Sequence, residues 1–138
     1  MNKKRFNVGP CDFAMLFVSA FLCIGINSFF KTCGPKADGS WMTCHWAGQA
    51  LKAFALALFI ISLIHFCISE PKIKQGISVA VIPVALFSAI IPGGYIRLCM
   101  AQTMRCHSIT RPAVIVLSVL LIISAVIDII CQRSKSRG

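Results

Sequence analysis

The sequence predicts an all-α bundle of four transmembrane helices, made of two parallel-repeat helical hairpins. Three observations predict it. Apolar residues make up 57% of the 138 residues and charged residues only 13%. The apolar residues form four long blocks, and the same Cys/Met/His pattern occurs in two of the connections between them. Blocks of this kind are typical of membrane spans, and the length allows a single domain.

The expected helices follow the apolar blocks at residues 13–30, 46–69, 77–91 and 112–131. A helix of about 20 residues crosses about 30 Å of hydrocarbon, so the short third block needs its polar flanks to reach both interfaces. Pro83 in its middle is expected to kink the helix or open its backbone ladder. The first block follows a basic segment, as in a signal peptide, but no small-x-small cleavage site comes after it, so it is interpreted as a helix.

Positive charges predict the orientation. One side of the membrane receives eight cations, in the two ends of the chain and the second connection: Lys3, Lys4, Arg5, Lys72, Lys74, Arg133, Lys135 and Arg137. The other side receives six: Lys31, Lys36, Lys52, Arg97, Arg105 and Arg111. The bias predicts a multi-pass protein of the cell membrane with both termini cytoplasmic. The net charge of +10 lies at block ends, which favours lipid headgroups and not nucleic acid as its partner.

An internal repeat connects the two outer loops. Met42, Cys44 and His45 recur 62 positions later as Met104, Cys106 and His107. Upstream, Cys33 and Cys99 each end an aromatic-apolar-cation-x-Cys run, 66 positions apart. The repeat is expected to cover about 11–70 and 75–133. Parallel repeats are related by an axis along the membrane normal, which would bring the two loops together above the bundle.

Three chemistries fit this outer cap of Cys, Met and His. The four cysteines Cys33, Cys44, Cys99 and Cys106 are candidates for disulfides, with three connectivities left open. The same pairs resemble the outer cysteines of quinone-linked membrane thiol oxidases, although Cys-x-x-Cys is absent. Met, Cys and His are also suitable ligands for copper(I) or haem iron. The spacings typical of c-type haem attachment and of structural zinc sites are absent.

Polar residues continue from each motif into the next helix. Gln49 and Lys52 share a helix face with His45, and Arg111 shares one with His107. Lys52 is expected to snorkel to the headgroups, and the alternative is a positive vestibule for a phosphate or carboxylate.

Different roles are expected for the ionisable residues inside the spans. His65 is expected to bond to a neighbouring helix, and Asp128 to pair with the basic edge at Arg133. Asp12 and Asp128 lie near the cytoplasmic ends, so no carboxylate is expected at mid-membrane, which argues against a proton-coupled multidrug transporter. Cys11, Cys67 and Cys131 are expected to be free thiols and Cys23 to be buried packing. No hydrolase motif is present.

The segments Cys33-Gly34-Pro35, Met42-x-Cys44-His45-Trp46 with Gln49, and Met104-x-Cys106-His107 with Thr110-Arg111-Pro112 resemble an uncharacterised family. Its members are small bacterial four-helix membrane proteins with a domain of unknown function. The resemblance implies the fold and the importance of these residues. Members are often encoded near ABC transporters of the macrolide-exporter type, which implies such a partner.

We therefore expect a non-enzymatic accessory subunit of a membrane transport system, which contacts lipid and either a second copy or an ABC-type partner. Its outer cap is expected to be disulfide-stapled or to bind a soft metal or haem. The alternative is a quinone-linked membrane thiol–disulfide oxidoreductase.

Overall fold

A computed structural model describes residues 8–29, 34–41, 43–97, 103 and 106–138. It confirms the all-α class with the helices α1 Pro10–Ser28, α2 Thr43–Cys67, α3 Pro71–Ile90 and α4 Arg111–Arg137, and a π-helical turn η1, Cys106–Thr110, directly before α4. All four helices are long and apolar enough to cross a membrane. The chain is therefore a multi-pass membrane protein.

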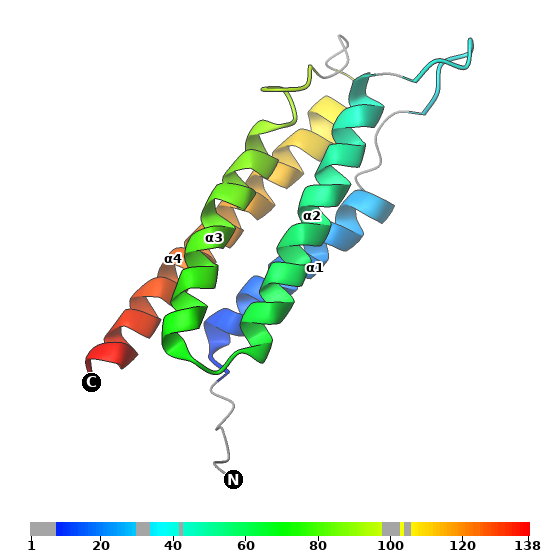
Figure 1. Ribbon diagram of the computed structural model, residues 1–138. Helices are drawn as coiled ribbons and strands as arrows, with labels where there is room; N and C mark the ends of the chain where they lie inside the picture. The colour runs from blue at the N-terminus through cyan, green and yellow to red at the C-terminus, as the bar shows by residue number, and fades with distance from the viewer. Residues whose placement is uncertain (1–7, 30–33, 42, 98–102, 104–105) are drawn as a thin grey trace.

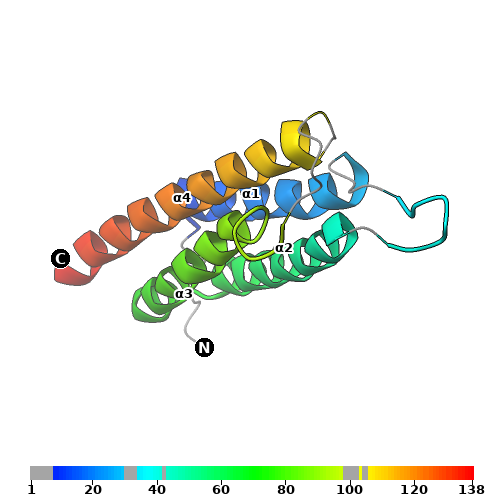
Figure 2. The same cartoon turned by 90° about the horizontal axis from the view of Figure 1, so that it is seen from above.

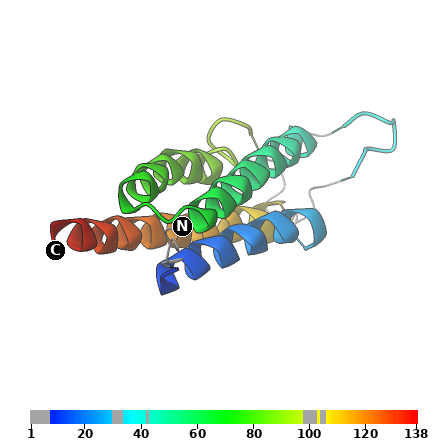
Figure 3. The same cartoon turned by 60° about the horizontal axis from the view of Figure 1, so that its bottom comes forward.

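The helices form a ring in which α1 lies between α2 and α4, and α3 lies between the same two helices on the opposite side (Figures 1 and 2). The start of α1, the α2–α3 turn and the end of α4 lie at one end of the bundle, here called the terminal end (Figure 3). The two longer connections lie at the other end, here called the loop end. The cytoplasmic location of the terminal end stays a prediction from the cation count.

Proline begins three of the helices. Pro10, Pro71 and Pro112 all lie in the first turn, where the missing N–H leaves no helix bond unmade. As a result α1 and α3 begin earlier than the apolar blocks predicted, and Lys74 belongs to a helix and not to a connection. α3 continues as one helix through Pro83, whose ring is exposed.

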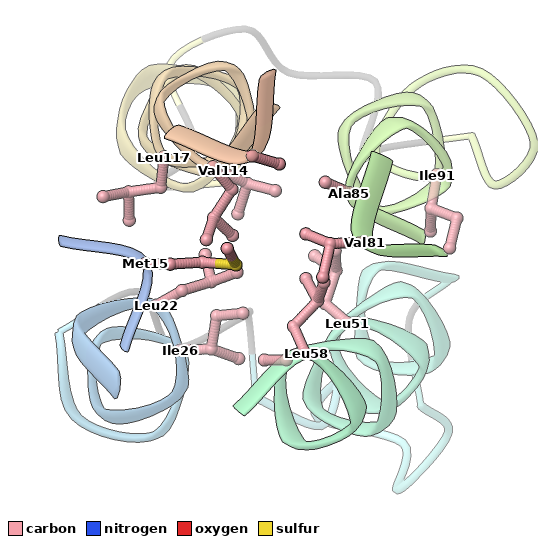
Figure 4. Close-up of a cluster of buried hydrophobic side chains, with 13 residues drawn as sticks. Met15, Leu22, Ile26, Leu51, Leu58, Val81, Ala85, Ile91, Val114 and Leu117 are labelled. Atoms are coloured by element: carbon pink, nitrogen blue, oxygen red, sulfur yellow. The ribbon is translucent and has the colours of Figure 1, made fainter. Parts of the chain in front are cut away.

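The core lies on the inward faces of all four helices (Figure 4). Met15, Leu22, Leu58, Val81 and Leu121 are fully buried there. The outward faces are equally apolar, and Phe17, for example, is 73% exposed. A helix that is apolar on every side is typical of a membrane span, where lipid covers the outer face.

Candidate functional site

A group of polar side chains is buried inside the terminal end of the bundle, and we call it the buried ionisable cluster. It contains Asp12 of α1, His65 of α2, Lys74 and Ser78 of α3, and Asp128 and Gln132 of α4. None of its four ionisable side chains is more than 2% exposed. Ionisable residues inside a membrane bundle are costly, and they mark functional sites often enough to make this the principal candidate.

The four ionisable residues form a chain of contacts in the order Lys74, Asp12, His65 and Asp128. Lys74 Nζ donates to Asp12 Oδ2 at 2.7 Å. Asp12 Oδ1 lies 3.4 Å from His65 Nδ1, and His65 Nε2 lies 3.0 Å from Asp128 Oδ2. The imidazole of His65 therefore lies between two carboxylates, with one ring nitrogen facing each of them.

Asp128 is surrounded by hydrogen-bond donors. Ser78 Oγ donates to its Oδ2 at 2.6 Å, and Gln132 Nε2 donates to its Oδ1 at 3.3 Å. The Ser78 hydroxyl also lies 3.0 Å from His65 Nε2. Asp128 thus contacts His65 and Ser78 in place of the basic edge that the sequence suggested for it.

Asp12 has one satisfied and one unsatisfied oxygen. Its Oδ2 accepts from Lys74 and from the Gly9 amide at 2.8 Å, which also caps the start of α1. Its Oδ1 is buried and has no hydrogen-bond partner among the described residues, because the contact with His65 Nδ1 does not meet hydrogen-bond geometry. An unsatisfied buried carboxylate oxygen is uncommon and needs a physical reason.

The cluster also has the composition of a cation site. Asp12, His65 and Asp128 each offer a ligand atom, and these atoms lie within 4.8 Å of one another. Lys74 already supplies a positive charge at Asp12. The arrangement can therefore hold a proton or a cation between α1, α2 and α4.

The π-helical turn sets which face of α4 points inward. The buried residues Leu51, Ala55, Leu58 and His65 of α2 have buried counterparts 63 positions later, namely Val114, Ser118, Leu121 and Asp128. The Met-x-Cys-His motifs are only 62 positions apart. A π turn accommodates one additional residue, and η1 lies between the second motif and α4. This shift brings Asp128 inward, while Ile127 is 46% exposed.

At the loop end, the structure describes part of the predicted cap. Cys44 is fully buried and disulfide-bonded. The half-buried His45 ring stacks on Trp41, with 4.0 Å between ring centroids, and lies 5.8 Å from the ring of Trp46. Its Nε2 lies 3.4 Å from Gln49 Nε2. His107 is half-buried in η1.

Other predicted site residues lie at the surface or outside the described part of the chain. Gln49, Lys52 and Arg111 are exposed, and the Arg111 guanidinium packs against the turn at Gly93. Cys33, Met42, Cys99 and Met104 lie outside the described residues, as does the side chain of Cys106. The expected free thiols Cys11, Cys67 and Cys131 are confirmed, and Cys23 is also free and half-buried.

From the sequence, His65, Asp12 and Asp128 had separate expected roles, and their meeting in one cluster was not predicted. Lys74 was counted among the headgroup cations, and Ser78 and Gln132 were not considered. A signal was present, because Lys74 and Ser78, and likewise Asp128 and Gln132, are spaced i, i+4 and share a helix face.

The comparison with protein families gives a match over most of the chain. The family described as Domain of unknown function (DUF4418) matches residues 15–131. The chain belongs to this family. The match to DUF4418 covers α2 and α3 completely and most of α1 and α4. Within the cluster it includes His65, Lys74, Ser78 and Asp128, while Asp12 precedes its first residue and Gln132 follows its last. No curated protein matches the chain, and no solved structure does.

Proposed function

We propose that this DUF4418 chain is a non-enzymatic accessory subunit of a membrane transport system, with an outer cap stapled by disulfides. The observation that carries the proposal is the state of Cys44, which is disulfide-bonded and fully buried at the start of α2. Disulfide exchange requires a thiolate to reach a disulfide sulfur. The Cys44 sulfur is inaccessible, which favours a staple over an electron relay.

The same disulfide reduces the number of ligands available for a copper or haem site at the cap. A cysteine held in a disulfide offers no thiolate to copper(I), since the thiolate is the metal ligand. A copper or haem site at the cap would then have to do without Cys44 and the cysteine bonded to it. The His45 ring stacks on Trp41 and faces Gln49, an arrangement suited to an aromatic residue of the membrane interface.

The lateral surface supports a role through contact with another membrane protein. Large apolar side chains are exposed on every helix, with Phe17, Trp46, Leu86 and Ile130 as examples. Ala53 is exposed on α2, and small residues allow helices of two membrane proteins to approach closely. We propose an ABC-type permease or a second copy of this chain as the partner, with lipid covering the remaining surface.

The test compares Cys44→Ser with Cys67→Ser, whose thiol is exposed and free. A stapled cap predicts a free energy of unfolding lower by about 2–4 kcal/mol for Cys44→Ser, because a loop closure is lost. Cys67→Ser should leave it unchanged. A mixed disulfide trapped between a cap cysteine variant and a partner would favour the quinone-linked thiol oxidoreductase instead.

The accessory role has its own measurement. Crosslinking in the native membrane should capture a permease or a second copy of the chain, and the same complex should persist in mild detergent. A chain that stays monomeric in both conditions contradicts the accessory role and leaves the stapled cap unaffected.

A further inference from the structure

We propose that the buried ionisable cluster is a proton-binding site, in which His65 holds one proton between Asp12 and Asp128. The site lies at the opposite end of the bundle from the cap, so it does not depend on the function proposed above. Its ligand is the simplest cation, and its protein groups come from all four helices.

The hydrogen-bond inventory of His65 is the first argument. A neutral imidazole carries one N–H donor and one acceptor nitrogen, whereas an imidazolium carries two donors. His65 Nε2 faces Asp128 Oδ2 at 3.0 Å, and His65 Nδ1 faces Asp12 Oδ1 at 3.4 Å. Ionised carboxylates only accept hydrogen bonds. With both carboxylates ionised and the Ser78 hydroxyl donated to Asp128, both ring nitrogens need a hydrogen, and a small rotation of the ring would bring Nδ1–H to the otherwise unpartnered Asp12 Oδ1.

Charge balance is the second argument. Asp12 and Asp128 contribute two negative charges, and Lys74 contributes one positive charge. Among the residues that the structure describes, the thiol of Cys11 also interacts with Asp12, Asp128 and the thiol of Cys131, and a thiol is neutral when protonated. A net charge buried in a low-dielectric interior is costly. One further proton makes the cluster neutral, and His65 is the group that faces both carboxylates.

The geometry favours a proton over a metal ion. Asp12 Oδ2 is occupied by the Lys74 ammonium at 2.7 Å. The Asp128 carboxylate, the His65 imidazole and the Ser78 hydroxyl lie 2.6–3.0 Å from one another, at lengths of direct hydrogen bonds. A metal ion would have to separate groups that are already bonded to each other.

The placement of the cluster gives the proton a structural consequence. Asp12 and Lys74 come from helices on opposite sides of the ring, and so do His65 and Asp128. The cluster thus connects α1 with α3 through Asp12 and Lys74, and α2 with α4 through His65 and Asp128. The contact between His65 and Asp12 joins these two connections. Loss of the proton leaves two carboxylates facing one ammonium, which weakens the connection between the α1–α2 and α3–α4 hairpins.

Histidine NMR on the full chain in detergent tests the proposal by measuring the wild-type cluster directly. The chain has three histidines, and His65→Gln assigns the signals of His65. At the acid end of about pH 5–8, the range in which histidine changes its charge, both His65 ring nitrogens should carry a proton. A ring with a single protonated nitrogen over this whole range would overturn the proposal.

Charge-restoring variants give a second test. His65→Gln removes the proton site and leaves one net negative charge, so the midpoint of thermal unfolding should fall. His65→Gln with Asp128→Asn restores neutrality, so the midpoint should recover part of that loss and lose the pH dependence that His65 gives the wild-type chain. Lys72→Gln, at an exposed position of α3, is the control and should change neither quantity.

Two results would contradict a proton site. If the double variant loses at least as much in its unfolding midpoint as His65→Gln and Asp128→Asn lose together, these residues contribute hydrogen bonds and no charge balance. A stoichiometric amount of a transition metal in the wild-type chain, lost in His65→Gln, would assign the cluster to a metal ion.

Discussion

Lys74 Nζ lies 2.7 Å from Asp12 Oδ2 in the interior of the bundle, although α3 and α1 are on opposite sides of the helical ring. The pair therefore connects two helices that are not neighbours. It does so at the terminal end, where α1 and α3 both begin. A buried ion pair in this position fixes the relative position of the two hairpins.

Removing one partner of this pair should be strongly destabilising. Lys74→Met leaves Asp12 without its counter-charge, and a broken buried pair typically costs about 3–5 kcal/mol of unfolding free energy. Lys72→Met, two residues away and exposed, is the matched control and should have little effect. Asp12→Asn combined with Lys74→Met should recover much of the loss. Equal stability of the two lysine variants would contradict the importance of the pair.

Two glycine substitutions should have opposite effects on stability. A Cβ atom at Gly94 would clash with the backbone carbonyl oxygen of Ile90, and the backbone can move little to relieve the clash. Gly94→Ala should therefore lower the free energy of unfolding by about 1–3 kcal/mol. Gly76, within α3, has open space around it, so Gly76→Ala should stabilise by about 0.5–1 kcal/mol. Denaturation of both variants in one detergent makes the comparison.

Thiol labelling of intact cells tests the predicted orientation. Cys67 and Cys131 are free and exposed at the terminal end. If this end is cytoplasmic, a membrane-impermeant reagent should label them only after the cells are permeabilised. After reduction of the cap, the same reagent should label Cys106 in intact cells, whereas the buried Cys44 should stay unlabelled. Labelling of Cys131 in intact cells would reverse the orientation.

Histidine variants distinguish a stapled cap from a metal-binding cap. In a stapled cap, His45→Ala should cost only the stacking on Trp41, on the order of 0.5–1.5 kcal/mol. A stapled cap binds no ion, so neither His45→Ala nor His107→Ala should change the copper or haem content. If the two histidines share one copper or haem, His45→Ala alone should remove it as completely as the double variant. Copper and haem content per chain, measured beside a non-reducing gel, decides between the two.

Much of the fold could be predicted from the sequence because the governing effects are local. In lipid every backbone polar group needs an internal partner, so a long apolar block has to be a helix. The block lengths therefore predicted four spans, and the even number predicted both termini on one side. The predicted ends were less accurate. Pro10 and Pro71 start α1 and α3 among polar residues, ahead of the apolar blocks, and α4 continues past its apolar block to Arg137.

Only the tertiary structure decided that four ionisable side chains meet in one cluster, namely Asp12, His65, Lys74 and Asp128. In a soluble helix the polar face shows which side is outside, but these helices are apolar on both their lipid face and their core face. The local sequence pattern therefore does not predict how each helix is rotated about its own axis. This rotation is set by packing among the four helices and, for α4, by the additional residue in η1 that turns Asp128 toward His65.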